Sequence, residues 1–305
     1  MNKKSNRWYI EYINEDLSYS SRLKNVIYTG QSKFQHIDII ETIPFGKALI
    51  LDGKTQSSES DEHIYHELLV QPALHSLDKV QNIFIAGGGE GATAREALSH
   101  NGVESVTMVD LDKEVVRVCK QYLPNHHKGS FDDKRMTLIY DDALNYLSTT
   151  NEIYDLVIID ISDPLEAGPA YKLFTQEFYT IVFNHLENNG MMVLQAGSCG
   201  PLDHKDVFTA IYKTVDSIYP ITRGYNGFIP SYNSDWGFII GSKTIDPALL
   251  LQEKIDNKIQ KNLADDLKYY DGKLHEGLFN LSKEVRTSIK NEDRIITLDN
   301  PIFIV

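Results

Sequence analysis

Cysteine is scarce in this chain of 305 residues, which contains only Cys119 and Cys199. Two cysteines cannot supply the disulfide framework of a secreted scaffold, so a reducing compartment fits best. The first residues lack the apolar segment that a signal peptide needs. No apolar run approaches the roughly 18 residues that a membrane-spanning helix requires. We therefore expect a cytoplasmic protein with no membrane partner.

Positive charge is also in short supply, because 30 Lys and Arg stand against 43 Asp and Glu, a formal net charge of −13. Binding to a phosphate backbone requires a basic face, so nucleic acid is not expected as a partner. An acidic surface keeps a protein in solution, and it also attracts cationic ligands. Charge alone leaves both interpretations open.

The first part of the chain, residues 1–75, is expected to form a small β domain. Apolar and β-branched residues at 34–41 and 48–51 predict strands, with turns at 44–46 and 52–53. Residues 61–74 follow as a helix, since Ile64 and Leu68 recur at helical spacing.

Strands and helices alternate over residues 76–245, which predicts an α/β domain with a doubly wound sheet. Strands are expected at 82–86, 106–109, 136–140, 155–159, 191–195, 221–225 and 237–241, and helices at 92–98, 113–122, 176–186 and 205–219. Residues 246–305 are expected to form a polar, helical C-terminal extension without chemistry of its own.

Acidic residues follow successive predicted strands, and this is the strongest chemical signal in the sequence. They are Glu90, Asp110, Asp141, Asp142 and Asp160. Ligands of an open parallel sheet bind beyond the carboxyl ends of its strands, so these side chains should meet at one edge.

A glycine-rich turn at 87–91 joins the first of these strands to a helix, the usual setting of a nucleotide-binding turn. Glu90 within it would repel a pyrophosphate, so a neutral or cationic nucleoside is favoured. A plain tight turn is the structural alternative.

Asp110 ends the second strand of the domain, where a carboxylate can accept hydrogen bonds from ribose hydroxyls. Asp112 fits the N-cap of the next helix better, which leaves Asp110 available for a ligand. Asp142 could accept from an adenine amino group or cap the following helix, and the local pattern favours neither.

Asp160 and Asp163 follow a strongly apolar strand, and Gly168 and Pro169 lie in a loop long enough to act as a lid. Paired carboxylates suit a polycation whose ammonium groups need counter-charges once water is excluded. A structural ion pair or a turn is the alternative.

Other candidates are weaker. Tyr65, Gln195 and Tyr232 could line the binding site or simply pack. No metal is expected, because the pair His66-Glu67 lacks the second histidine of a zinc-protease helix.

Together these segments resemble the spermidine synthase family of aminopropyltransferases. The matching segments are 34–36, 51–56, 61–67, 87–91, 109–112, 141–142 and 160–164, in the family's order and spacing. The resemblance implies an N-terminal β domain, a methyltransferase-like Rossmann domain and a homodimer or homotetramer. It implies no metal or cofactor, because decarboxylated S-adenosylmethionine is a co-substrate.

Within the family the chain looks most like the thermospermine synthases. Glu90 in the glycine turn carries this resemblance, together with segments 163–171, 195–197, 229–237, 270–273 and 281–286. Segment 121–126 looks closer to bacterial spermidine synthases. The expected reaction moves an aminopropyl group to spermidine and gives thermospermine and methylthioadenosine. The alternatives are putrescine as the acceptor, which gives spermidine, or spermine as the product.

The resemblance also implies roles for individual residues. Gln35, Asp110, Asp142, Ala143 and Pro169 are expected to bind the nucleoside half of the donor. His66, Glu90, Asp160 and Asp163 are expected on the polyamine or aminopropyl side, with Asp160 as the proton acceptor and Tyr65, Gln195 and Tyr232 as further contacts. The cluster of Glu90, Asp160 and Asp163 disfavours a methyltransferase, which needs no row of carboxylates for a polycation. The intact Asp160 argues against a non-catalytic polyamine-binding protein.

Overall fold

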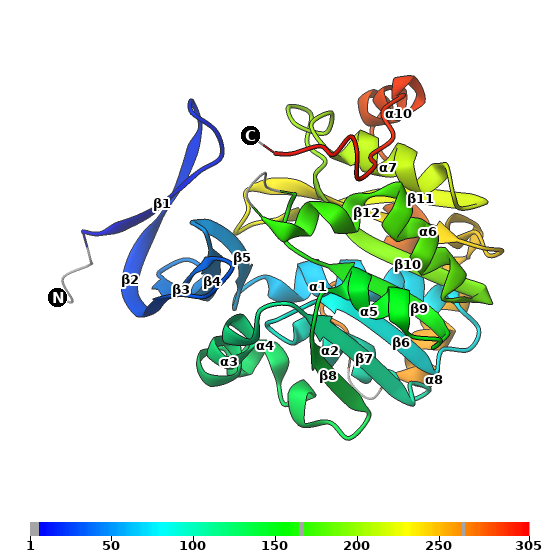
Figure 1. Cartoon of the computed structure of the whole chain (residues 1–305), viewed down its shortest axis with the longest axis horizontal. Helices are drawn as coiled ribbons and strands as arrows, with labels where there is room; N and C mark the ends of the chain where they lie inside the picture. The colour runs from blue at the N-terminus through cyan, green and yellow to red at the C-terminus, as the bar shows by residue number, and fades with distance from the viewer. Residues whose placement is uncertain (1–5, 165–167, 264–265, 305) are drawn as a thin grey trace.

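The computed structural model describes residues 6–164, 168–263 and 266–304. Figure 1 shows a small N-terminal β unit beside a larger α/β unit. The small unit is a five-stranded antiparallel sheet in the order β1-β2-β3-β4-β5. Its strands are β1 (Trp8–Tyr12), β2 (Ser18–Gln31), β3 (His36–Thr42), β4 (Gly46–Leu51) and β5 (Lys54–Ser58).

The turn between β4 and β5 has a local cause. Asp52 and Gly53 both have positive φ, 47° and 79°. Two-residue hairpin turns that match the twist of the strands require this conformation, and an Asp-Gly pair adopts it readily. The predicted turn at this position is therefore present.

The large sheet has seven strands in the order β11-β12-β10-β9-β6-β7-β8. They are β6 (Asn82–Gly87), β7 (Ser105–Asp110), β8 (Met136–Tyr140), β9 (Tyr154–Asp160), β10 (Leu186–Ser198), β11 (Ile221–Ile229) and β12 (Ser234–Ser242). The strands from β10 to β8 pair in parallel, and β11 and β12 add an antiparallel edge.

Helices cover both faces of this sheet. They are α1 (Glu62–Ser76), α2 (Ala92–Leu98), α3 (Lys113–Tyr122), α4 (Pro124–His127), α5 (Ala143–Thr149), α6 (Gln176–Asn184) and α7 (Phe208–Asp216). Alternate residues of β6 enter two separate cores, with Phe84 in one and Ile83 in the other. Both are fully buried, which explains why the strand is continuously apolar. The predicted doubly wound α/β fold is confirmed.

Several predicted boundaries differ from the structure. β10 begins at Leu186 instead of residue 191, because its first residue pairs with Tyr154 before the register shifts. α6 ends at Asn184, and α7 spans Phe208–Asp216, shorter than the expected 205–219.

The C-terminal extension is helical in part, as expected, with η3 (Pro247–Leu249), α8 (Gln252–Asn262), α9 (Gly272–Leu278) and α10 (Lys283–Asn291). It is tied to α1, since the Glu67 carboxylate accepts from the backbone N–H groups of Lys268, Tyr269 and Tyr270 at 2.8–2.9 Å. α1 itself contacts α2 and the strands of the large sheet. The division at residues 75 and 245 stays a prediction, and the packing of α1 favours a first boundary before Glu62.

Candidate active site

The parallel strands bring the predicted acidic residues to one edge of the large sheet. β6 and β9 end in register, with Gly87 opposite Asp160, and Asp110 is the last residue of β7. Glu90 lies in the turn that follows β6. The residues come from different segments of the chain, yet the common direction of the strands places them at the same edge.

The glycine turn is pressed against the end of β9. Gly88 N–H donates to the backbone oxygen of Asp160 at 2.8 Å. Gly87 has a φ of +82°, and a Cβ there would lie 2.1 Å from the same oxygen. Only glycine fits this backbone position, so the turn fixes Glu90 relative to Asp160.

Two hydroxyl groups hold the Asp160 carboxylate. Tyr65 donates to its Oδ1 at 2.7 Å, and Thr93 donates to its Oδ2. Burial and the nearby Glu90 carboxylate raise the pKa of Asp160 to about 6, against the opposing effects of His66 and the two hydroxyls. The group is therefore ionised near neutral pH but close to its titration range. Thr93 was not predicted; its position in the first turn of α2, three residues after Glu90, is the signal that could have found it.

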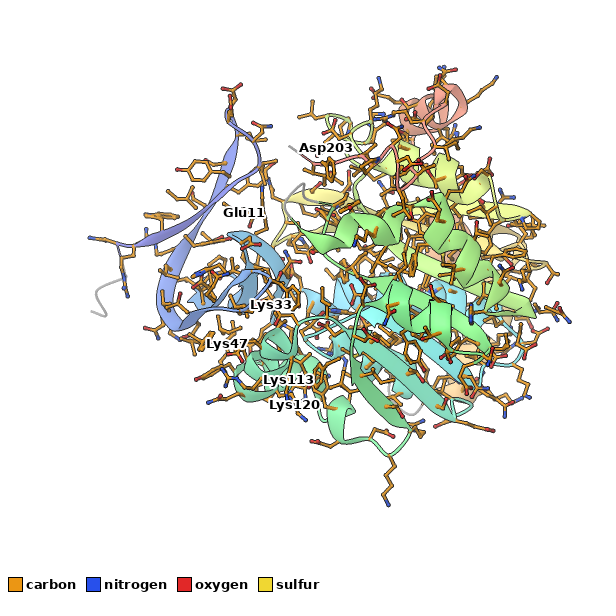
Figure 2. All side chains as sticks on the ribbon, in the orientation of Figure 1. Glu11, Lys33, Lys47, Lys113, Lys120 and Asp203 are labelled. Atoms are coloured by element: carbon orange, nitrogen blue, oxygen red, sulfur yellow. The ribbon has the colours of Figure 1, made fainter. Side chains whose placement is uncertain are left out.

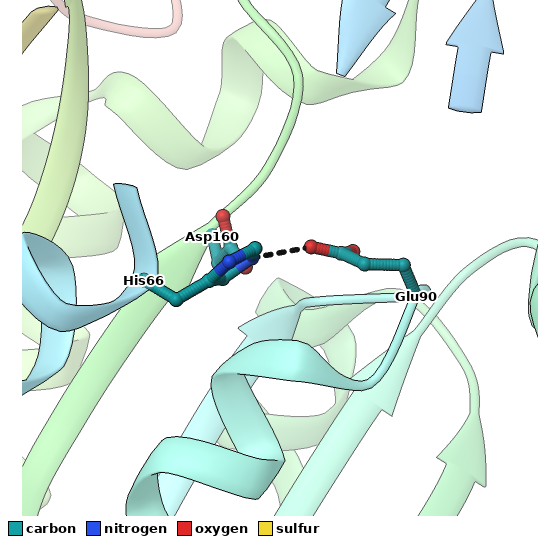
Figure 3. A group of neighbouring side chains, drawn as sticks. All are labelled: His66, Glu90 and Asp160. Carbon is teal, nitrogen blue, oxygen red and sulfur yellow. Dashed lines mark hydrogen bonds and ion pairs between the residues drawn. The ribbon is translucent and has the colours of Figure 1, made fainter. Parts of the chain in front are cut away.

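His66 is fully buried, and both of its ring nitrogens face carboxylates. Nε2 lies 2.6 Å from Glu90 Oε1, the contact drawn in Figure 3, and Nδ1 lies 3.0 Å from Glu62 Oε2. These acids outweigh burial and raise the pKa of His66 to about 10. His66 thus contacts Glu90 directly, and its predicted contact with the polyamine stays a prediction.

A metal could in principle be held here, since His66, Glu90 and Asp160 offer ligand atoms that all lie within 4.8 Å of one another. Both imidazole nitrogens already face carboxylates, and a proton on each nitrogen makes these two contacts hydrogen bonds without a metal ion. The expectation of a metal-free enzyme stays a prediction.

Asp163 is positioned by Gln195 on β10. The Gln195 amide donates to Asp163 Oδ1 at 3.3 Å and to the backbone oxygen of Ile161 at 2.7 Å, and it accepts from Trp236 Nε1 at 3.1 Å.

Burial raises the pKa of Asp163 to about 6, while Lys54 lowers it and Glu11 raises it. These last two residues belong to the N-terminal sheet; Figure 2 labels Glu11 on β1. The small unit therefore contributes charge to this side of the site.

Three aromatic rings lie beside the acidic groups, since Tyr65 donates to Asp160 and Trp236 donates to Gln195. The Tyr65 ring lies 6.1 Å from the Tyr232 ring, which in turn lies 4.9 Å from Trp236, both in edge-to-face geometry. Tyr232 also donates to the backbone oxygen of Gln56, a second link to the N-terminal sheet.

The residues assigned to the donor lie around β7 and β8. Asp110 Oδ1 accepts from Asp112 N–H at 2.8 Å, and burial raises the pKa of Asp110 to about 7. Asp112 caps α3, as predicted, and its Oδ2 accepts from Gln35 Nε2 at 3.0 Å. Gln35 is thereby brought from the N-terminal unit to the same edge.

Asp142 is an N-cap, because its Oδ1 accepts from Leu144 N–H at 2.8 Å and from Asn145 N–H at 3.4 Å. The capping alternative is thus present, and the adenine contact stays a prediction. Ala143 is the buried first residue of α5. Pro169 begins η2 (Pro169–Phe174), but its side chain and the loop residues 165–167 lie outside the described part of the structure.

Comparison with known proteins identifies this arrangement. The family model "Spermine/spermidine synthase domain" matches residues 62–251, and "Spermidine synthase tetramerisation domain" matches residues 7–59. The chain belongs to the spermine/spermidine synthase family. The predicted family and fold are confirmed, and the protein is an aminopropyltransferase.

Relatives match over almost the whole chain. The polyamine aminopropyltransferase of Sulfolobus acidocaldarius is 41% identical over 97% of both chains. The thermospermine synthase ACAULIS5 of Arabidopsis thaliana is 36% identical over 99% of this chain and 89% of that protein.

Solved structures agree with these relatives. A spermidine synthase in complex with the transition-state analogue AdoDATO has a TM-score of 0.87 and 31% identity, covering 94% of this chain and 96% of that one. The spermidine synthase of Thermotoga maritima has a TM-score of 0.84 and 31% identity, covering 93% and 94%. Among the described residues of this aminopropyltransferase, no helix is long and apolar enough to cross a membrane.

Proposed function

We propose that this aminopropyltransferase uses spermidine as its acceptor and forms thermospermine and methylthioadenosine. The observation that carries the proposal is the group of partly or fully buried acids Glu90, Asp160 and Asp163 at one sheet edge. A triamine has one more ammonium group than a diamine, and these carboxylates can match it with charged hydrogen bonds. The likeness to ACAULIS5, named a thermospermine synthase, supports the same acceptor.

In the proposed reaction the enzyme aligns a neutral amine with the carbon beside the donor's sulfonium. The nitrogen lone pair forms the new C–N bond while the C–S bond breaks, and its electrons remain on sulfur in methylthioadenosine. Before this step Asp160 accepts a proton from the protonated substrate amine, which frees the nitrogen lone pair for attack. Because a polyamine amine resembles a lysine amine with a pKa near 10, a positioned acceptor is needed at neutral pH. Alignment of the amine with this carbon supplies the remaining rate enhancement, since the sulfonium is already an activated leaving group.

Binding is divided between two groups of residues in this proposal. The donor's nucleoside half contacts Gln35, Asp110, Asp142, Ala143 and Pro169. The polyamine and aminopropyl groups contact Glu90, Asp160 and Asp163, together with His66, Tyr65, Gln195 and Tyr232. A methionine carboxylate close to these acids would be repelled, which favours the decarboxylated donor over S-adenosylmethionine.

The match to the tetramerisation domain supports assembly of the chain with further copies of itself. A homodimer or homotetramer in the cytoplasm, without a cofactor, remains our expectation.

A product analysis tests the acceptor. The enzyme is incubated with decarboxylated S-adenosylmethionine and either spermidine or putrescine, and the products are separated by chromatography that resolves thermospermine from spermine. We expect thermospermine from spermidine, and little turnover of putrescine, because the shorter acceptor leaves one acid unpaired. Predominant formation of spermidine from putrescine, or of spermine from spermidine, would refute this acceptor assignment and leave the aminopropyltransferase activity intact.

A further inference from the structure

Four side chains, three of them buried and Arg95 partly buried, form a continuous series of charged groups behind the acidic edge. Arg95 on α2 donates to both oxygens of Glu62, at 3.1 and 2.8 Å. Glu62 Oε2 lies 3.0 Å from His66 Nδ1, and His66 Nε2 lies 2.6 Å from Glu90 Oε1. Positive and negative groups alternate along this series, and only its last member, Glu90, belongs to the row of strand-end acids.

The geometry fixes where the protons lie. His66 Nδ1 faces the backbone oxygen of Glu62 at 2.6 Å as well as the Glu62 carboxylate, and both of these groups only accept hydrogen bonds. Nε2 faces another carboxylate, that of Glu90. A neutral imidazole would direct one lone pair at a carboxylate oxygen. His66 is therefore held as an imidazolium, and its charge balances Glu90.

Charged and titratable groups surround this imidazolium from every packed element. Glu62 comes from α1, Glu90 from the glycine turn and Asp160 from β9, and the Tyr65 ring lies 5.0 Å away. His126 on α4 lies within electrostatic range, and its backbone oxygen accepts from Arg95. Glu62 is thus one of the two acids that face the imidazole nitrogens, and Arg95 holds it by two hydrogen bonds.

We propose that Glu62 and Arg95 are positioning residues of this enzyme, which act through His66 to keep Glu90 ionised and fixed at the edge where the cationic substrate binds. This inference rests on the proposed role of Glu90 toward an ammonium group of the substrate. Neither Glu62 nor Arg95 contacts the substrate in this arrangement. Their effect is on the charge and orientation of a carboxylate that does.

The chain offers a closely matched control. Glu96 also binds Arg95, with its Oε1 2.8 Å from Nη2, and it is about as buried as Glu62. Its other oxygen accepts from Gln71 at 2.7 Å and does not face His66. Glu62→Gln and Glu96→Gln therefore each remove one charge from the same arginine, but only Glu62→Gln removes a carboxylate from the imidazole.

The experiment measures His66 in the ligand-free enzyme and turnover in parallel. His66 is followed by NMR of its ring from pH 6 to 10, and kcat and KM are measured over the same range. In Glu62→Gln we expect the His66 titration to move down by at least about one pH unit, because one of its two stabilising carboxylates is lost. Above the new pKa, the KM for spermidine or for decarboxylated S-adenosylmethionine should rise about tenfold, with a smaller change in kcat. Glu96→Gln should resemble the wild type.

Two results would overturn the inference: equal shifts in both variants, or an unchanged His66 titration in Glu62→Gln. If Glu62→Gln does not fold, Arg95→Lys provides the test, since lysine keeps the charge but cannot hold both Glu62 oxygens in the same fork. It should shift the His66 titration in the same direction by a smaller amount. The NMR measurement needs no polyamine, so failure of the acceptor assignment is seen separately in the product analysis.

Discussion

The acidic edge of the large sheet and the N-terminal hairpin, formed by β1 and β2, depart from ordinary protein surfaces in opposite ways. At the edge, the charged residues His66 and Glu90 are 0% and 9% exposed. On β1, the apolar residues Trp8, Ile10 and Tyr12 are 50%, 47% and 66% exposed. Buried charge and clustered exposed apolar surface are the two informative departures from the usual pattern, since scattered exposed apolar residues are common. We expect the first region to bind a small cation, as proposed above, and the second to contact another protein surface.

The two faces of β1 show how closely these regions are joined. Exposed residues alternate with Tyr9 and Glu11, which face the rest of the chain. Tyr9 donates to the backbone oxygen of Gly53 at 2.7 Å, and Glu11 accepts from Thr55 N–H at 3.1 Å. One face of a single strand thus contributes charge near Asp163, while the other face is exposed in the single chain.

The largest effect is expected at the centre of the acidic edge. Asp160→Asn should lower kcat by about a hundredfold or more, the usual scale for loss of a positioned proton acceptor. Steady-state turnover to methylthioadenosine measures this change. Binding of methylthioadenosine, measured by calorimetry, should be nearly unchanged.

The control for this variant lies at the opposite end of the same strand. Asp155 accepts from the backbone N–H groups of Gln81 and Asn82 at 2.8 and 2.9 Å, far from the carboxyl edge. Asp155→Asn should leave kcat within about threefold, as for residues without contact to the reacting atoms. Near-normal turnover in Asp160→Asn would contradict the role given to this carboxylate.

The sequence predicts much of the acidic edge because strand ends can be read locally. The apolar runs of β6 and β9 fix where each strand stops, and parallel pairing then brings Glu90 and Asp160 together. Glu62 and Arg95 could not be found in this way. Each is a charged residue on a predicted helix, where a solvent-exposed position is the ordinary expectation. Only the packing of α1 against α2 pairs them and removes most of their surface from solvent.

The same limit applies to the N-terminal unit. Lys54 and Glu11 act on Asp163 through the folded arrangement of the two units, which no local pattern encodes. β2 spans 14 residues because its first part pairs with β1 and the remainder pairs with β3. Long-range pairing decided its length.

An intermediate effect is expected at Asp110, where binding and stability should change in opposite directions. Asp110→Asn should weaken methylthioadenosine binding about tenfold or more, since a hydrogen bond to a charged group contributes about 1.5–3 kcal/mol. The folded-state pKa of about 7 lies above the ordinary value, so the native protein binds the proton more tightly than the unfolded chain. The wild type therefore loses stability as pH rises from about 4 to 7, the interval between the two pKa values.

Asparagine has no charge to bury, so the free energy of unfolding of Asp110→Asn should exceed that of the wild type by on the order of 4 kcal/mol above pH 7. The difference should shrink toward pH 4. Calorimetric binding and denaturant unfolding at pH 5 and pH 8 measure the two effects. Unchanged affinity, or a stability difference that does not depend on pH, would show that this strand end is an ordinary surface position.

The smallest effect on turnover is expected at the exposed face of β1. A double variant there tests most sharply whether this face and the acidic edge act separately. Ile10→Glu combined with Tyr12→Glu places two charges on the exposed face of β1, within the residues 7–59 that match the tetramerisation domain. Burying two unpaired charges is costly, so the assembly should dissociate, as seen in the mass measured by light scattering. The value of kcat per chain should stay within about threefold, because Glu11 and Lys54 on the inward side are untouched.

Leu249→Glu, at a 75% exposed position on η3, is the control and should leave the mass unchanged. An unaltered mass in the double variant would mean that this face is not an interface. A large fall in kcat on dissociation would mean that the acidic edge needs the neighbouring copy, and the two regions would then form one functional unit.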